Sequence, residues 1–106
     1  MCQHDSLAKN SDGFVLWCNE CRVYNLYFKN IVMTLDERGL YQFKENIATC
    51  YAENLNSSKD RNRRTILFDT QVNGMRFCFS TNDVGSLLSL MQEAELSYYE
   101  LKYILG

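Results

Sequence analysis

Apolar and polar residues alternate along residues 23–35, and this alternation predicts two paired β-strands. A two-residue turn at Lys29-Asn30 would leave one face of the hairpin wholly apolar, as a half-buried sheet requires. The predicted pairs on that face are Phe28 with Ile31, Leu26 with Met33, and Tyr24 with Leu35. Lys-Asn is a weaker turn signal than Asn-Gly, so one longer, bulged strand is the alternative.

A second hairpin is predicted near the start of the chain. Asp12-Gly13 is a tight-turn signal, because glycine readily adopts the positive backbone angles that such turns need. A turn centred on these two residues would place His4 opposite Cys21.

A third hairpin is predicted where residues 65–70 and 75–80 flank Asn73-Gly74, which is the strongest hairpin signal in the chain. A two-residue turn there would form an apolar face in which Phe68 opposes Phe79 and Thr70 opposes Phe77. The other face would carry Leu67, Asp69, Arg76 and Cys78.

Two helices are predicted from apolar residues at spacings of three and four. The first runs from about residue 36 to 53, and Thr34 and Glu37 have the spacing of a capping box at its start. Its apolar face consists of Leu40, Phe43, Ile47, Cys50 and Tyr51. The second runs over 81–105 with a heptad seam of Val84, Leu87, Met91, Ala94, Tyr98, Leu101 and Leu105.

For the second helix we favour a long helix laid across the sheet. A seam of this length could also pair with its copy in a homodimer or with a protein partner. The reason is a set of further apolar positions outside the seam, namely Leu88, Leu90, Tyr99 and Ile104.

Two short Cys/His pairs flank the first hairpin, Cys2-Gln3-His4 and Cys18-Asn19-Glu20-Cys21. Small tetrahedral zinc sites are commonly assembled this way, because each pair delivers two donors from one local segment. Three thiolates and one imidazole suit zinc better than magnesium, calcium or an iron-sulfur cluster. Four protein ligands leave no position for water or substrate, so we expect a structural zinc ion at Cys2, His4, Cys18 and Cys21.

Other interpretations of these residues stay open. Cys18 and Cys21 could be ordinary half-buried thiols, a thioredoxin-like redox pair or a disulfide. A disulfide is the less favoured of these, because the sequence shows no export signal. Cys2 lies beside the initiating methionine, so a site of only His4, Cys18 and Cys21 is a further alternative.

The elements and the ligand pairs predict one α+β domain over residues 1–106, an antiparallel sheet with an N-terminal zinc-ribbon-like hairpin and two helices packed on one face. Its expected segments are metal-clipped hairpins over 1–35, a helix over 36–53, a mobile basic loop over 54–64, a hairpin over 65–80 and a helix over 81–105. The chain has 106 residues, no proline and no linker or repeat, which fits one small core.

Catalytic chemistry finds little support in the sequence. The single histidine is already assigned to the metal, and no Walker loop, nucleophile elbow or dinucleotide fingerprint is present. Cys50 lies on the apolar face of the first helix, and Cys78 beside Arg76 has no general base, so both are expected to be structural. We expect a protein that is not an enzyme and has no small-molecule substrate.

The balance of charged residues limits the classes of partner that the protein could bind. With 11 Lys+Arg against 13 Asp+Glu, the surface as a whole does not suit nucleic acid or anionic lipid. One basic cluster, Lys59, Arg61, Arg63 and Arg64, could contact phosphates, although a solvated loop is the favoured interpretation. No window approaches the ~18 apolar residues of a spanning helix and no signal peptide is apparent, so we expect a cytoplasmic protein without a membrane partner.

The order of Cys2-x-His4, Cys18-x-x-Cys21, sheet, helix, Arg63-Arg64 and a terminal leucine-rich helix resembles a small family of uncharacterised bacterial proteins, found mostly in the Bacteroidota. The resemblance spans nearly the whole chain and implies a zinc-ribbon-like site at the four Cys and His residues, without an activity. We predict a non-enzymatic interaction or regulatory module with a structural zinc ion. The alternative is a nucleic-acid-binding zinc-ribbon protein that uses the basic loop.

Overall fold

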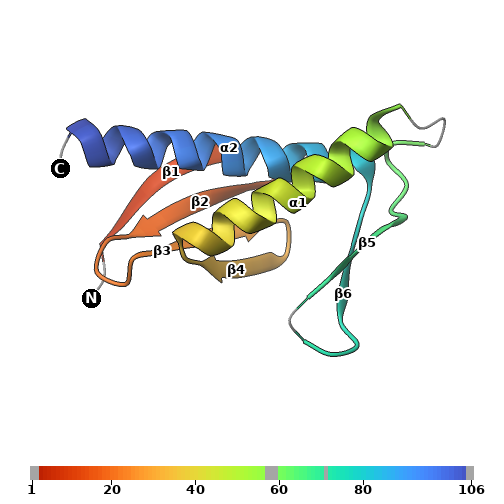
Figure 1. The fold of residues 1–106 in the computed structure, drawn as a ribbon, viewed down its shortest axis with the longest axis horizontal. Coiled ribbons are helices and arrows are strands. Elements are labelled where there is room, and N and C mark those ends of the chain that lie inside the picture. The colour runs from red at the N-terminus through yellow and green to blue at the C-terminus, as the bar shows by residue number, and fades with distance from the viewer. Residues whose placement is uncertain (1–2, 57–59, 71, 105–106) are drawn as a thin grey trace.

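Four strands form one antiparallel sheet in chain order, and two more strands form a separate hairpin. The computed structural model describes residues 3–56, 60–70 and 72–104. Its elements are β1 (His4–Asn10), β2 (Gly13–Cys18), β3 (Val23–Phe28), β4 (Ile31–Leu35), α1 (Glu37–Leu55), β5 (Ile66–Asp69), β6 (Arg76–Phe79) and α2 (Thr81–Ile104). The helices lie side by side against the sheet, and the β5–β6 hairpin extends away from it (Figure 1). The predicted α+β class is therefore confirmed.

The β3–β4 hairpin has the predicted register. Phe28 pairs with Ile31, Leu26 with Met33 and Tyr24 with Leu35, so the expected apolar face is present. Lys29 occupies the first turn position with a φ of 52°, a conformation that glycine usually supplies. The burial of one whole face sets the register here, and the turn residue adapts to it.

In the first hairpin the predicted register is wrong. His4 pairs with Cys18 and not with Cys21. Two shifts combine to cause this: the turn begins one residue earlier than predicted, and β1 contains a bulge between residues 6 and 8 that leaves Leu7 without a partner in β2. The bulge lets both Leu7 and Ala8 be buried, although they are adjacent in sequence.

The side chain of Asn10 explains the earlier turn. Its Oδ1 accepts hydrogen bonds from the backbone N–H groups of Asp12 (2.8 Å) and Gly13 (3.1 Å). Gly13 then pairs with Asn10 and is not itself a turn residue. Its φ is not positive, but a Cβ at this position would lie 1.9 Å from the Tyr27 carbonyl oxygen. Glycine is therefore required for the close approach of β2 to β3.

The β5–β6 hairpin also differs from its predicted register, by two residues. Phe68 pairs with Phe77, and Ile66 takes the predicted place of Phe68 opposite Phe79. The loop is longer than two residues, because the backbone N–H of Thr70 donates to the carbonyl of Met75 (3.3 Å). A shift of two residues keeps each side chain on its predicted face.

Helix α1 begins at Glu37, one residue later than predicted, and its cap lies two residues after Thr34, where a capping box with Glu37 would place it. Asp36 is the N-cap, and its carboxylate accepts the Gly39 backbone N–H at 2.7 Å. Thr34 instead remains in β4, where its hydroxyl donates to Asn25 across the strands (2.9 Å). On the predicted apolar face, Leu40 and Ile47 are fully buried, and the other members are half-buried.

The predicted seam of helix α2 packs against the core of the same chain. Val84, Leu87, Met91, Ala94 and Tyr98 are all buried in the core. The core also contains Leu90, together with Val15, Trp17, Tyr24, Leu26 and Phe28 from the sheet. Neither this helix nor any other helical segment in residues 3–56, 60–70 and 72–104 combines the length and apolarity that crossing a bilayer demands.

A polar network joins the start of α2 to two turns of the sheet. The Lys29 ammonium lies 3.2 Å from a carboxylate oxygen of Asp12 and 3.5 Å from one of Asp83. Asp83 also accepts the Ser80 backbone N–H and pairs with Arg64 at 3.2 Å. Burial opposes the charged form of Asp83, but the Ser80 N–H and Arg64 outweigh it and hold the pKa of Asp83 below 3.8.

The close approach at Gly13 predicts a large effect of a small substitution. Gly13→Ala should lower the free energy of unfolding by about 3 kcal/mol or more, because a Cβ cannot fit against the backbone of β3. Gly74→Ala is the control: it has a φ of 79° but open space around it, so it should cost about 1–2 kcal/mol. Urea unfolding compares the two, and equal costs would contradict this account of Gly13.

The network predicts a pH-dependent effect of Asp83→Asn. At pH 7 this variant should lose about 2–3 kcal/mol, because Lys29 and Arg64 lose a buried carboxylate partner. The folded pKa of Asp83 is lowered, so its contribution is complete above 3.8 and is lost as the pH falls through the folded value.

Unfolding of wild type and Asp83→Asn should therefore differ less at pH 3 than at pH 7. Asp69→Asn, an exposed aspartate without an ion pair among the described residues, should match wild type at both pH values. A gap for Asp83→Asn that stays constant with pH would disprove the role of its charge.

Candidate functional site

The Cys18–Cys21 segment forms a tight turn between β2 and β3. The Arg22 backbone N–H donates to the Cys18 carbonyl at 2.8 Å, and the Cys21 backbone N–H donates to the Cys18 sulfur at 3.4 Å. Arg22 closes the turn with a φ of 57°, in the left-handed region. The backbone is thus wrapped around the Cys18 sulfur.

His4 lies beside this turn on the neighbouring strand. Because His4 and Cys18 are cross-strand partners, their side chains share a face of the sheet. Cys18 is 1% exposed, whereas His4 and Cys21 are exposed. A carboxylate oxygen of Glu20 lies 3.7 Å from the Cys18 sulfur.

The predicted metal site is only partly covered by the described residues. Among residues 3–56, 60–70 and 72–104, no three Cys, His, Asp or Glu side chains lie close enough to hold a metal ion. The alternative site of His4, Cys18 and Cys21 alone is therefore not assembled. Cys2 lies outside the described residues, so the four-ligand zinc site stays a prediction, and it requires His4, Cys18 and Cys21 to move closer together when the metal binds.

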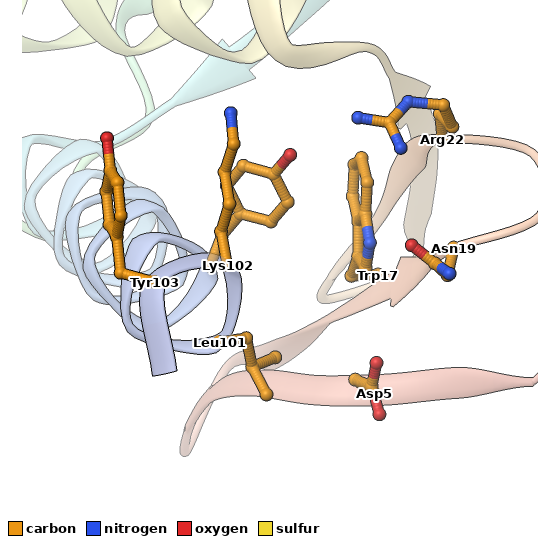
Figure 2. A pocket seen from close by; sticks show the side chains of 8 residues that line it. Asp5, Trp17, Asn19, Arg22, Leu101, Lys102 and Tyr103 are labelled. Carbon is orange, nitrogen blue, oxygen red and sulfur yellow. The ribbon is translucent and has the colours of Figure 1, made fainter. Parts of the chain in front are cut away.

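A cleft of about 510 Å³ borders the Cys18–Cys21 turn. It lies between the C-terminal end of α2 and the sheet, and Figure 2 shows Trp17 and Arg22 on one side with Lys102 and Tyr103 on the other. Its lining residues are Asp5, Trp17, Asn19, Arg22, Tyr98, Leu101, Lys102 and Tyr103. Two of these, Asn19 and Arg22, belong to the turn that carries the cysteines.

Aromatic rings and cations form the walls of this cleft. The rings of Trp17 and Tyr98 lie 4.5 Å apart between centroids, with Arg22 5.9 Å from the Trp17 ring and Lys102 5.9 Å from the Tyr98 ring. The Tyr98 hydroxyl donates to Glu37 at 2.7 Å. Burial and this hydrogen bond raise the pKa of Tyr98, so the phenol stays protonated.

Apolar side chains continue from the cleft onto the outer face of α2. Leu96, Tyr99 and Tyr103 are 62%, 45% and 78% exposed and lie at helical spacing. We call these three residues the α2 stripe. Of the residues predicted for a dimer, Tyr99 belongs to the stripe, but Leu90 is buried in the chain's own core and Leu88 packs against it. The Ile104 side chain and Leu105 lie outside the described residues.

The described residues of the predicted basic cluster make different contacts. Arg61 donates to the Leu55 carbonyl at 2.9 Å, at the end of α1, and Arg64 pairs with Asp83. Arg63 is exposed, and Lys59 lies outside the described residues. Helix α1 reaches Leu55 and so includes the first two residues of the predicted loop. Nucleic-acid binding through this cluster stays a prediction.

The two remaining cysteines are not part of the cleft. Cys50 is half-buried on α1, and burial raises the pKa of its thiol. Cys78 is exposed on β6, with its sulfur 3.3 Å from the Arg64 carbonyl.

Sequence reasoning identified the Cys18–Cys21 turn but missed the cleft beside it. Trp17 precedes the turn directly, and Tyr98 was assigned only to the seam of α2. Their contact depends on where α2 crosses the sheet, and periodicity does not define that position. The one available signal was the only tryptophan of the chain beside a predicted ligand.

The model of a family of unknown function matches residues 1–104 of the chain. Searches of curated proteins and of solved structures found no match. The resemblance to a family without an assigned activity is confirmed over nearly the whole chain. The chain belongs to the family of unknown function DUF6686.

Proposed function

We propose that this protein is a non-enzymatic binding module whose cleft receives a segment of a partner protein, with one wall of the cleft held by a structural zinc ion. The observation that carries the proposal is the position of the Cys18–Cys21 turn. The same turn supplies two predicted metal ligands and, through Asn19 and Arg22, part of the cleft wall. A metal at the cysteines would therefore set the shape of the cleft.

The hydrogen bonds of the turn support zinc as its occupant. The Cys21 backbone N–H directed at the Cys18 sulfur favours the thiolate, which is the form that binds metal, whereas the nearby Glu20 carboxylate favours the thiol, whose proton metal binding would release. His4 adds an imidazole on the same face, and the sequence provides Cys2 as the fourth donor. Such a donor set suits zinc, and four protein ligands make the site structural.

The surface around the cleft supports a protein partner. Tyrosine, tryptophan and arginine are the residues that most often dominate binding energy at protein interfaces. Arg22 and Tyr103 line the cleft with exposed side chains beside the buried Trp17, and Leu96 and Tyr99 extend its apolar surface along α2. An extended or helical segment of a partner could contact both the cleft and the stripe.

Metal content and stability test the zinc ion. Natively purified, untagged protein should contain about one zinc per chain by elemental analysis. A chelator should lower the melting temperature by about 10 °C or more, since structural zinc contributes several kcal/mol to folding. It should also change the emission of Trp17, the only tryptophan, because its neighbour Cys18 would be released.

Single cysteine variants locate the metal. Cys21→Ser should lose the zinc, whereas Cys78→Ser, an exposed cysteine outside the turn, should keep it. Protein without metal, whose melting is unchanged by the chelator, would refute the zinc site. Equal zinc content in both variants would refute its location.

The α2 stripe tests the partner. A double variant, Tyr99→Ser with Tyr103→Ser, should keep the wild-type melting temperature, because both rings are exposed, and should lose at least tenfold in affinity for the partner. Tyr41→Ser is the control, since Tyr41 is 53% exposed on α1 and lies outside the cleft and the stripe. Binding to immobilised protein and sedimentation velocity supply the measurements.

The outcomes separate three cases. A heterologous protein that binds wild type and Tyr41→Ser but not the double variant supports the proposal. A dimer that the double variant abolishes replaces the partner with a second copy of the chain. Equal binding to all three proteins would exclude the stripe as the interface.

A further inference from the structure

A second cleft lies between the β5–β6 hairpin and the turn that joins β3 to β4. Its volume is about 440 Å³, within the range of about 300–1,000 Å³ that is usual for small-molecule sites. Its lining residues are Phe28, Lys29, Asn30, Ile31, Arg64, Arg76, Phe77, Cys78, Phe79 and Asp83. None of these residues borders the first cleft, so the two are separate.

Three cations from distant parts of the chain line this second cleft. Lys29 comes from the β3–β4 turn, Arg64 from the segment before β5, and Arg76 from the start of β6. Within the part of the chain that the structure describes, the only carboxylate in this lining is that of Asp83, which pairs with Lys29 and Arg64. Lys29 is also paired with Asp12, so the excess positive charge of the lining lies on the arginines, and it favours an anion there.

The side chain of Arg76 is available to bind an anion. Among the described residues it has no ion pair, and its cross-strand partner Asp69 is not within salt-bridge distance. Arg64 is paired but retains 58% exposure of its side chain. Two guanidinium groups with exposed surface suit a phosphate, because their planar N–H groups can donate two hydrogen bonds each to its oxygens.

The apolar part of the cleft consists of phenylalanine rings. Phe28 and Phe79 pack edge to face with centroids 5.9 Å apart, and Phe77 stacks on Phe79 at 5.6 Å. Phe79 is buried, whereas Phe77 is half-buried and so keeps some surface in the cleft. A flat ring attached to the anion could pack against this surface.

We propose that the second cleft binds a mononucleotide, with its phosphate at Arg64 and Arg76 and its base against Phe77. A free nucleotide fits better than a nucleic-acid strand, because the other arginines of the basic cluster do not extend the cleft into a groove. Arg61 is bound to the end of α1, and Arg63 does not line the cleft. A strand would need further phosphate contacts along its backbone.

Calorimetric titration of the full-length protein with AMP, adenosine and inorganic phosphate tests the proposal. AMP should bind, and adenosine and phosphate should each bind at least about tenfold more weakly, because each provides only half of the contacts. Arg76→Ala should weaken AMP binding by about tenfold or more. Its melting temperature should not change, since Arg76 makes no ion pair among the described residues. Arg63→Ala, an exposed arginine outside the cleft, should bind AMP like wild type.

Three results would overturn the proposal. The first is no heat of binding with AMP at millimolar concentration, and the second is equal weakening by Arg76→Ala and Arg63→Ala. The third is a single-stranded oligothymidylate that binds far more tightly than AMP, with an affinity that falls steeply with salt, which would assign the cations to nucleic acid. Because Trp17 does not line this cleft, its emission distinguishes AMP bound here from a ligand in the first cleft.

Discussion

The Lys29 ammonium joins two turns of the sheet to the start of α2, because it contacts the carboxylates of both Asp12 and Asp83. Lys29 reaches these contacts from a left-handed turn position, and its backbone N–H also donates to the Asp12 carbonyl at 2.7 Å. Asp83 in turn exchanges hydrogen bonds with Ser80 at the start of the helix. The strain of a positive φ costs about 1–2 kcal/mol, which these contacts offset. Lys29 thus adds a polar link at the start of α2 to the buried apolar contacts between this helix and the sheet.

The position of that junction determines both clefts. With its first turn held at Lys29, α2 runs along the sheet so that its last turns, including Tyr98 and Lys102, lie over Trp17. The first cleft lies where these last turns of α2 face the Cys18–Cys21 turn. The second cleft lies at the opposite end of α2, where Lys29 itself contributes a cation. The same contacts that stabilise the fold therefore place the two candidate binding surfaces at a distance from each other.

The sequence predicted what depends on periodicity and missed what depends on local polar bonds. The β3–β4 register followed from one apolar face, and the buried residues of α2 followed from spacings of three and four. The predicted register of the first hairpin was wrong because hydrogen bonds to the Asn10 side chain place the turn one residue earlier, and the bulge at Leu7 shifts the pairing by one more residue. Neither event changes the apolar pattern enough to be read from it. The clefts were missed for a related reason. They form between elements that are distant in the sequence, and the pattern within one segment does not predict such contacts.

The two ends of the β1–β2 hairpin are held in different ways. At the turn, Asn10 donates to the Ser86 carbonyl of α2 and Asp12 pairs with Lys29, so polar bonds secure this end. At the other end, no residue of β1 forms an ion pair within the part of the chain that the structure describes, and His4 is exposed beside the buried Cys18. A small domain with a limited core gains stability from a cross-link. A zinc ion at His4 and Cys18 would supply that cross-link at the end of the sheet where the first cleft opens, which links the proposed metal to the shape of the binding surface.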